Sequence, residues 1–94
     1  MKAWVYITTN KKNGVLYVGV TSELKNRIIS HKTKKYKNSF SARYNLDKLV
    51  YFEGFDSIIT ARAREKQIKK TNRAKKLVLI ESLNPEWQDL YDTL

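Results

Sequence analysis

Four side chains in the first third of the chain could do chemistry together: the phenols of Tyr6 and Tyr17, the guanidinium of Arg27 and the imidazole of His31. A guanidinium stays charged and must meet a polar or anionic group, and an imidazole gains or loses its proton near neutral pH. Phenol hydroxyls both donate and accept hydrogen bonds. Such a set can hold an anion and move a proton beside it. The structural alternative is an aromatic pair across a hairpin, followed by a histidine beside the apolar stripe of a helix.

Two predicted strands, residues 3–8 and 15–20, carry the tyrosines and are joined by turn-forming residue types. A four-residue loop sets Tyr6 directly opposite Tyr17, whereas a two-residue turn at Lys12–Asn13, or one residue later, shifts the pairing. Because side chains alternate between the faces of a sheet, any register that pairs an odd with an even residue places both tyrosines on one face.

A predicted helix over residues 24–34 carries the other two side chains. Leu24 and Ile28 define its buried stripe, and Arg27 and His31 fall within roughly 60° of that stripe at 100° per residue. Residues four apart stand one above the other on a helix. We therefore expect Arg27 and His31 to lie together on the flank of the helix rather than on its solvent face.

The remaining chain predicts a strand and three helices after a basic loop. Residues 32–40 lack apolar periodicity, which favours a loop with at most a short helix. The elements that follow are a strand over 46–55, helices over about 57–70 and 72–83, and a short terminal helix from Pro85. Apolar side chains of this last segment, Trp87, Leu90 and Tyr91, are expected to seal the core. Without a linker or an internal repeat, residues 1–94 are expected to form a single domain.

Glu65 interrupts the apolar stripe of the helix over 57–70, where the spacing from Ile58 to Ile68 predicts a core position. An unpaired carboxylate in a core costs several kcal/mol, so the group must be paired, protonated or bound to a cation. Pairing with Arg62 or Lys69 is one alternative. The other is a carboxylate that looks into a cleft and holds Mg²⁺.

The composition points to a polyanionic partner, because the formal net charge is +10 over 94 residues. Nucleic acid is expected rather than a membrane, since the chain has neither a long apolar run nor a basic amphipathic helix with a large apolar face. The absence of cysteine fits a reducing compartment, and we expect a cytoplasmic protein. The alternative is a charged, solvated surface. The expected nucleic-acid contacts are Lys32, Lys34, Lys35, Lys69, Lys70, Arg73 and Lys75.

The motifs, in their order and spacing, resemble the active-site signature of the GIY-YIG nuclease superfamily, and especially its small single-domain bacterial members. They are Trp4-Val5-Tyr6, Tyr17-Val18-Gly19, Arg27, His31 and Glu65. The resemblance implies an α/β (α+β) fold, with a small three-stranded, mainly antiparallel sheet flanked by helices. It also implies a metal-dependent endonuclease that hydrolyses phosphodiester bonds, in DNA rather than RNA, with Mg²⁺ or Mn²⁺ as cofactor.

The resemblance assigns each of these side chains a role. Tyr6 would be the general base, which requires cationic neighbours or the metal to favour phenolate, because a free phenol has a pKa of about 10. Tyr17 would orient the water or the phosphate, and His31 would relay the proton. Arg27 would brace the developing charge, and Glu65 would bind the metal.

Two departures from the family pattern stand out. Trp4 replaces the first glycine of the family motif, and the family's C-terminal asparagine is either Asn84 or absent, because Asn72 fits a helix cap. The chain has no room for a separate recognition domain, so substrate shape or a partner protein is expected to give specificity. The alternative functions are a non-catalytic nucleic-acid-binding module and a structural or ribosome-associated protein; metal-dependent cleavage separates the nuclease from both.

Overall fold

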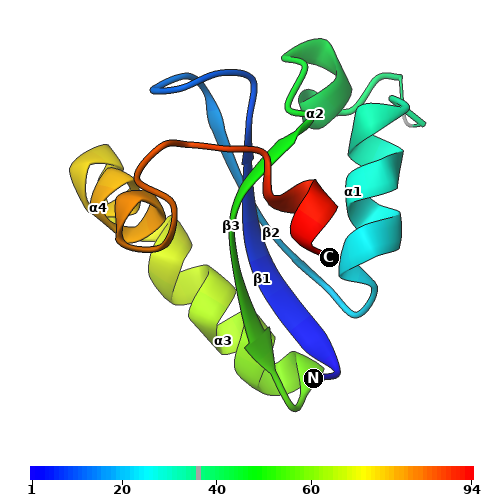
Figure 1. Ribbon diagram of the computed structural model, residues 1–94. Helices are drawn as coiled ribbons and strands as arrows, with labels where there is room; N and C mark the ends of the chain where they lie inside the picture. The colour runs from blue at the N-terminus through cyan, green and yellow to red at the C-terminus, as the bar shows by residue number, and fades with distance from the viewer. Residues whose placement is uncertain (36) are drawn as a thin grey trace.

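Three strands rich in β-branched and aromatic side chains form one antiparallel sheet. The strands are β1 (Ala3–Thr9), β2 (Leu16–Thr21) and β3 (Lys48–Phe55), in the order β2-β1-β3. β1 therefore has a hydrogen-bonded neighbour along both edges (Figure 1). The structure is a computed structural model that describes residues 1–35 and 37–94; Tyr36, in the predicted basic loop, lies outside the described residues.

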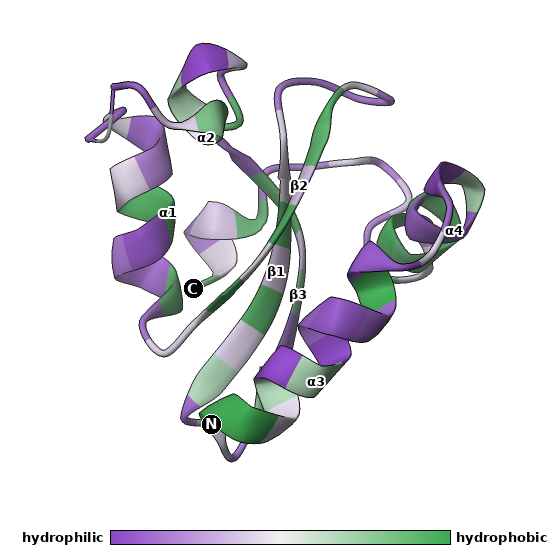
Figure 2. Cartoon of the chain, turned by 180° about the vertical axis from the view of Figure 1, so that it is seen from behind, coloured by the Kyte–Doolittle hydropathy of each residue, from purple (hydrophilic) through white to green (hydrophobic). Residues whose placement is uncertain are grey.

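Helices cover both faces of this sheet. They are α1 (Leu24–Lys32), α2 (Phe40–Arg43), α3 (Ile58–Lys69), α4 (Arg73–Leu83) and the 3₁₀ helix η1 (Leu90–Thr93). α1 and η1 lie on one face of the sheet, and α3 and α4 lie on the other (Figure 1). Figure 2 shows hydrophilic bands on α1 and α3, whereas the strands between them are mostly hydrophobic or neutral. The predicted sheet flanked by helices is confirmed.

No helix in the described ranges has the length and apolar character needed to cross a membrane.

Side-chain alternation along β1 divides the core between the two faces. Val5 and Ile7 are completely buried on the face that packs against α3 and α4, in a cluster with Ile80. Tyr6, between them in sequence, is completely buried on the other face, in a cluster with Ile28 of α1. The predicted alternation of β1 and the predicted stripe of α1 are both confirmed.

The β1–β2 hairpin turns at Lys12–Asn13, one of the two short turns considered above, where a backbone hydrogen bond of 2.9 Å closes the turn. The resulting register sets Tyr6 opposite Gly19 and Tyr17 opposite Thr8. The four-residue loop, which would have set the two tyrosines directly opposite each other, is therefore wrong. Odd residues still pair with even ones, so both tyrosines lie on the same face, as predicted.

The segment after α4 crosses from one face of the sheet to the other. Trp87 packs in the cluster with α3 and α4, whereas Leu90 and Tyr91 pack on the α1 face. Buried Asn84 fixes the crossing, because its side-chain amide donates to the carbonyl of Gln88 (2.7 Å) and accepts from the Gln88 N–H (3.0 Å). The segment seals the core as expected, but its short helix is the 3₁₀ helix η1 and does not begin at Pro85 as predicted.

An ion pair, which we call the Lys32 clamp, joins the last turn of α1 to η1. The Lys32 ammonium donates to the Asp89 carboxylate and to the Asp47 carbonyl (2.9 Å). Burial raises the pKa of Asp89, but the hydrogen bonds from Lys32 and from the backbone N–H groups of Tyr91 and Leu49 outweigh burial and hold this pKa below its usual value. The clamp therefore fixes α1 relative to both η1 and β3.

Replacing Lys32 with Met should lower the free energy of unfolding by about 1–2 kcal/mol at neutral pH, because Asp89 loses its charged partner. Since the folded-state pKa of Asp89 is depressed, this stabilisation is complete above the usual carboxyl value of 3.8 and disappears as the pH falls through the folded-state value. Urea denaturation followed by circular dichroism should show the difference at pH 7 and a smaller one in acid. Lys48→Met is the matched control, because its ion pair with Asp47 is more exposed. An equal decrease in the free energy of unfolding of the two variants would contradict a special stabilising role of the Lys32 clamp.

Candidate active site

The two tyrosines meet over a glycine in the neighbouring strand. The rings of Tyr6 and Tyr17 lie 6.2 Å apart between centroids. A Cβ built on Gly19, directly opposite Tyr6, would lie 2.5 Å from the Tyr6 hydroxyl oxygen and 2.9 Å from Cε2 of Tyr17. Real side chains do not approach that closely, so the phenol of Tyr6 can occupy this place only because residue 19 has no side chain.

α1 brings its two polar side chains to these tyrosines. Leu24 and Ile28 anchor the helix on the sheet, which turns its flank toward β1 and β2. The Tyr6 hydroxyl is hydrogen-bonded to Nε2 of His31 (3.2 Å), with the direction set by the imidazole tautomer. The imidazole lies 5.7 Å from the ring of Tyr6 and 5.6 Å from the ring of Tyr17. The predicted gathering of these groups on one face is therefore what the structure shows.

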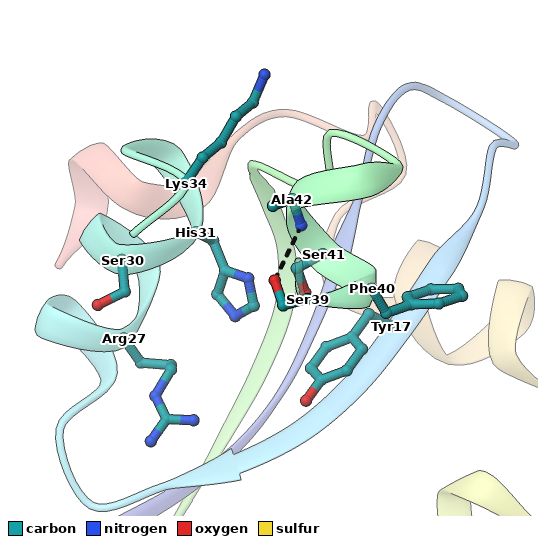
Figure 3. A pocket seen from close by; sticks show the side chains of 9 residues that line it. All are labelled: Tyr17, Arg27, Ser30, His31, Lys34, Ser39, Phe40, Ser41 and Ala42. Atoms are coloured by element: carbon teal, nitrogen blue, oxygen red, sulfur yellow. Dashed lines mark hydrogen bonds between the residues drawn. The ribbon is translucent and has the colours of Figure 1, made fainter. Parts of the chain in front are cut away.

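A pocket of about 220 Å³ opens beside this cluster. Figure 3 shows Tyr17, Arg27 and His31 around it, with the guanidinium, the imidazole and the phenol hydroxyl converging from α1 and β2. The opposite wall comes from Ser39 and the short helix α2, which sequence reasoning did not assign to the site. The available sequence signal was a helix-capping serine directly after the basic loop, since the Ser39 hydroxyl accepts from the Ala42 N–H (3.2 Å).

Burial decides the proton chemistry of Tyr6. Desolvation raises its pKa well above the usual phenol value, the nearby Tyr17 raises it further, and the Arg27 guanidinium lowers it by less. Tyr6 is therefore a neutral phenol at physiological pH. Arg27 alone does not meet the condition that cationic neighbours favour the phenolate of Tyr6, because complete burial outweighs one adjacent positive charge.

His31 responds to the same surroundings in the opposite direction. Burial, and then the positive charge of Arg27, lower its pKa from the usual 6.5. At neutral pH the imidazole is therefore uncharged and keeps one nitrogen that can accept a proton. Of the four clustered side chains, His31 is the one suited to act as a base.

Lys34 reaches the pocket through an unusual backbone conformation. α1 ends with hydrogen bonds from Lys34 N–H to His31 O (3.3 Å) and from Lys35 N–H to Ser30 O (3.1 Å), the pattern of a Schellman motif. Lys34 occupies its left-handed position (φ 54°), where glycine is the usual residue. Lys34 lines the pocket, and in Figure 3 its side chain extends away from Arg27, His31 and Tyr17.

Glu65 lies on α3, across the sheet from the tyrosines. Its side chain is 16% exposed and forms an ion pair with Lys69 (3.3 Å), so of the two predicted partners the structure selects Lys69 rather than Arg62. Arg62, one turn earlier on α3, lines a groove that passes the edge of β2 and reaches Arg27. Nowhere in the described ranges do three His, Cys, Asp or Glu side chains gather. One carboxylate still suits Mg²⁺, which keeps most of its own waters and takes its other ligands from a substrate.

The predicted nucleic-acid contacts fall into two groups on opposite sides of the sheet (Figure 1). Lys34 lines the pocket and Lys35 lines the groove at β2. Other members have intramolecular partners: Lys32 forms the clamp, Lys69 pairs with Glu65, and Arg73 donates to the carbonyls of Asn13 and Gly14 in the hairpin (2.8 and 2.7 Å). Lys69, Lys70 and Lys75 are exposed.

Both asparagines considered for the family's C-terminal asparagine have structural roles. Asn84 is buried with its amide fully used, and Asn72 caps α4 by accepting from the Lys75 N–H (2.9 Å). Neither lines the pocket.

Comparisons with known proteins agree with this fold. The family model described as the GIY-YIG catalytic domain matches residues 2–77. The chain is 39% identical to a UPF0213 protein of Syntrophus aciditrophicus (strain SB) over 85 residues, which cover 90% of this chain and 95% of that protein. It is 41% identical to the UPF0213 protein CPE1444 of Clostridium perfringens (strain 13 / Type A), over 84% of this chain and 83% of that one. The solution NMR structure of the UPF0213 protein BH0048 from Bacillus halodurans superimposes with a TM-score of 0.58 at 27% identity, covering 95% of this chain and 93% of the other.

Replacing Gly19 with Ala should displace the Tyr6 phenol and lower the free energy of unfolding by about 1–3 kcal/mol, as overpacking of a tight core does. Chemical denaturation gives the stability, and NMR contacts between Tyr6 and His31 report the displacement. Gly54→Ala is the matched control, because its Cβ would meet the flexible side chain of Met1 at 2.8 Å and Nε1 of Trp4 only at 3.3 Å. A Gly19→Ala protein with unchanged stability and an intact Tyr6–His31 contact would contradict the close approach.

Proposed function

This chain belongs to the GIY-YIG family of catalytic domains, and from that premise we propose that it is an endonuclease that hydrolyses phosphodiester bonds with the help of Mg²⁺ or Mn²⁺. The observation that carries the proposal is the convergence of Tyr17, Arg27 and His31 on one pocket, with Tyr6 hydrogen-bonded behind His31. Phosphodiester hydrolysis needs an anion-binding group, a neutral base and a hydroxyl that orients water, and this pocket brings the three together.

Each residue has one task in the proposed reaction. The Arg27 guanidinium binds a non-bridging phosphate oxygen and stabilises the charge that develops there. The Tyr17 hydroxyl orients a water molecule. In the tautomer whose Nε2–H donates to Tyr6, Nδ1 of neutral His31 accepts a proton from this water as its oxygen attacks phosphorus. The bond from phosphorus to the leaving sugar oxygen then breaks, and that oxygen takes a proton from solvent water. Tyr6 acts as a positioning residue, because its hydrogen bond to Nε2 holds the imidazole in place.

Glu65 is the residue we propose to hold the metal. Its ion pair with Lys69 would break when the metal binds. When bound, Mg²⁺ supplies positive charge that neutralises the phosphate and the leaving oxygen. Arg62 supports this placement, since it stands one helical turn from Glu65 and lines the groove that reaches Arg27.

The second candidate function is a nucleic-acid-binding module without catalysis, which the Glu65–Lys69 ion pair favours because the pair occupies the carboxylate. We propose DNA rather than RNA as the substrate and the cytoplasm as the location, on the family resemblance and the cysteine-free composition. A partner protein that adds specificity belongs to the same proposal.

Replacing Glu65 with Gln should lower cleavage by at least about 100-fold, because the variant loses the charge that holds the metal. Stability without metal should change little, since the ion pair with Lys69 is partly exposed. Gel assays with Mg²⁺ and with chelator measure cleavage, and amide NMR signals of residues 61–69 report metal binding. Glu86→Gln, at an exposed position, is the control. A Glu65→Gln protein that still cuts would refute the metal site; cleavage absent from the wild type under all metals would favour the binding module.

The pH dependence identifies the base. If His31 accepts the proton, kcat/KM rises with pH through an inflection below 6.5 and stays level across neutral pH, because the neutral imidazole is then fully formed. His31→Ala should lower kcat/KM by about 10²- to 10⁴-fold and remove this inflection. Tyr6→Phe keeps the ring and should retain the inflection at a lower rate. A rise only above pH 10 that disappears in Tyr6→Phe would assign the base to Tyr6 instead.

A further inference from the structure

Two aromatic side chains stand in solvent beside the pocket. Phe40 and Tyr44 are four residues apart on and just after α2, and their rings lie 4.7 Å apart between centroids. Phe40 is 49% exposed and Tyr44 is 45% exposed. We call this pair the aromatic platform. Large apolar side chains in mutual contact at the surface mark an interaction site more often than isolated ones do.

The aromatic platform continues the active site rather than standing apart from it. The ring of Phe40 stacks on the ring of Tyr17 at 6.4 Å and 30°, and Tyr17 in turn contacts His31. Phe40 also lines the pocket, as Figure 3 shows. A row of rings therefore runs from the half-buried imidazole outward to the solvent.

Positive charge surrounds this row. Lys34 lines the pocket and is exposed, and Arg43, between the two platform residues, is exposed as well. Polyanion binding sites for single strands combine such cations with aromatic faces on which bases stack. In a duplex each base face is covered by its neighbours, so only an unpaired nucleotide can offer a free face to these rings.

We propose that Phe40 and Tyr44 stack an unpaired nucleobase next to the phosphate held at Arg27, so that the substrate class is nucleic acid with unpaired nucleotides: single strands, flaps or bulges. This inference rests on the proposed function for its position in the substrate. The platform residues position the strand and take no part in the proton transfer.

The test measures binding with chelator present, so that no cleavage is needed. Fluorescence anisotropy compares a short labelled single strand with a duplex of the same sequence, for the wild type and for Phe40→Leu and Tyr44→Leu. Each leucine keeps the apolar character and removes the ring, and affinity for the single strand should fall by roughly 5- to 100-fold per ring while duplex affinity stays unchanged. A fluorescent purine analogue in the strand should be quenched by the wild type and less by the variants. Val78→Leu, at an exposed position on α4, is the control.

The outcomes separate this inference from the proposed function. Full single-strand affinity and full quenching in both leucine variants would overturn the platform, and loss of self-association in those variants instead would identify a protein contact and overturn it equally. A wild type that stacks the purine but never cuts with Mg²⁺ would refute the endonuclease and leave the platform standing. A wild type that cuts duplex and single strand equally, with no effect of Phe40→Leu, would support the endonuclease and refute the aromatic platform.

Discussion

The site depends on the close approach of the Tyr6 phenol to the backbone of Gly19. β1 is the central strand and Tyr6 is completely buried, so its hydroxyl must find a partner inside the protein. The missing side chain at Gly19 gives the ring its place, and Nε2 of His31 satisfies the hydroxyl. Because His31 belongs to α1, this contact joins the helix to β1 at the place where Leu24 and Ile28 pack it on the sheet, and it therefore helps to position Arg27.

Burial also separates the proton chemistry of the two neighbouring groups. The pKa of the Tyr6 phenol rises and the pKa of the His31 imidazole falls, because loss of water disfavours the charged form of each. Arg27 opposes the first shift and adds to the second. Tyr6 thus serves as a fixed neutral hydrogen-bonding group, and His31 is left uncharged where an anion would bind. A sequence resemblance identifies which residues occupy the site. It does not predict how burial and charge together shift their pKa values, because that depends on the packing around them.

Short-range patterns predicted much of this arrangement. Alternation along β1 placed both tyrosines on one face, and the stripe of Leu24 and Ile28 placed Arg27 and His31 beside them, because both periods follow from backbone geometry. Partners far along the chain could not be predicted in this way. Lys32 and Arg73 were expected to face phosphates, yet their partners lie about sixty residues away in sequence. The α2 wall was missed because a single helical turn has no period to read.

The Lys32 clamp links the active site to the order in which a ribosome makes the chain. β1, β2 and α1 are synthesised first, but the carboxylate that binds the end of α1 belongs to Asp89, and Leu90 and Tyr91 complete the same face. Before Asp89 is made, α1 therefore lacks the clamp and is held against the sheet by Leu24, Ile28 and the Tyr6–His31 contact. The pocket residues of α1 therefore gain this support only after a residue 57 positions beyond Lys32 has been made.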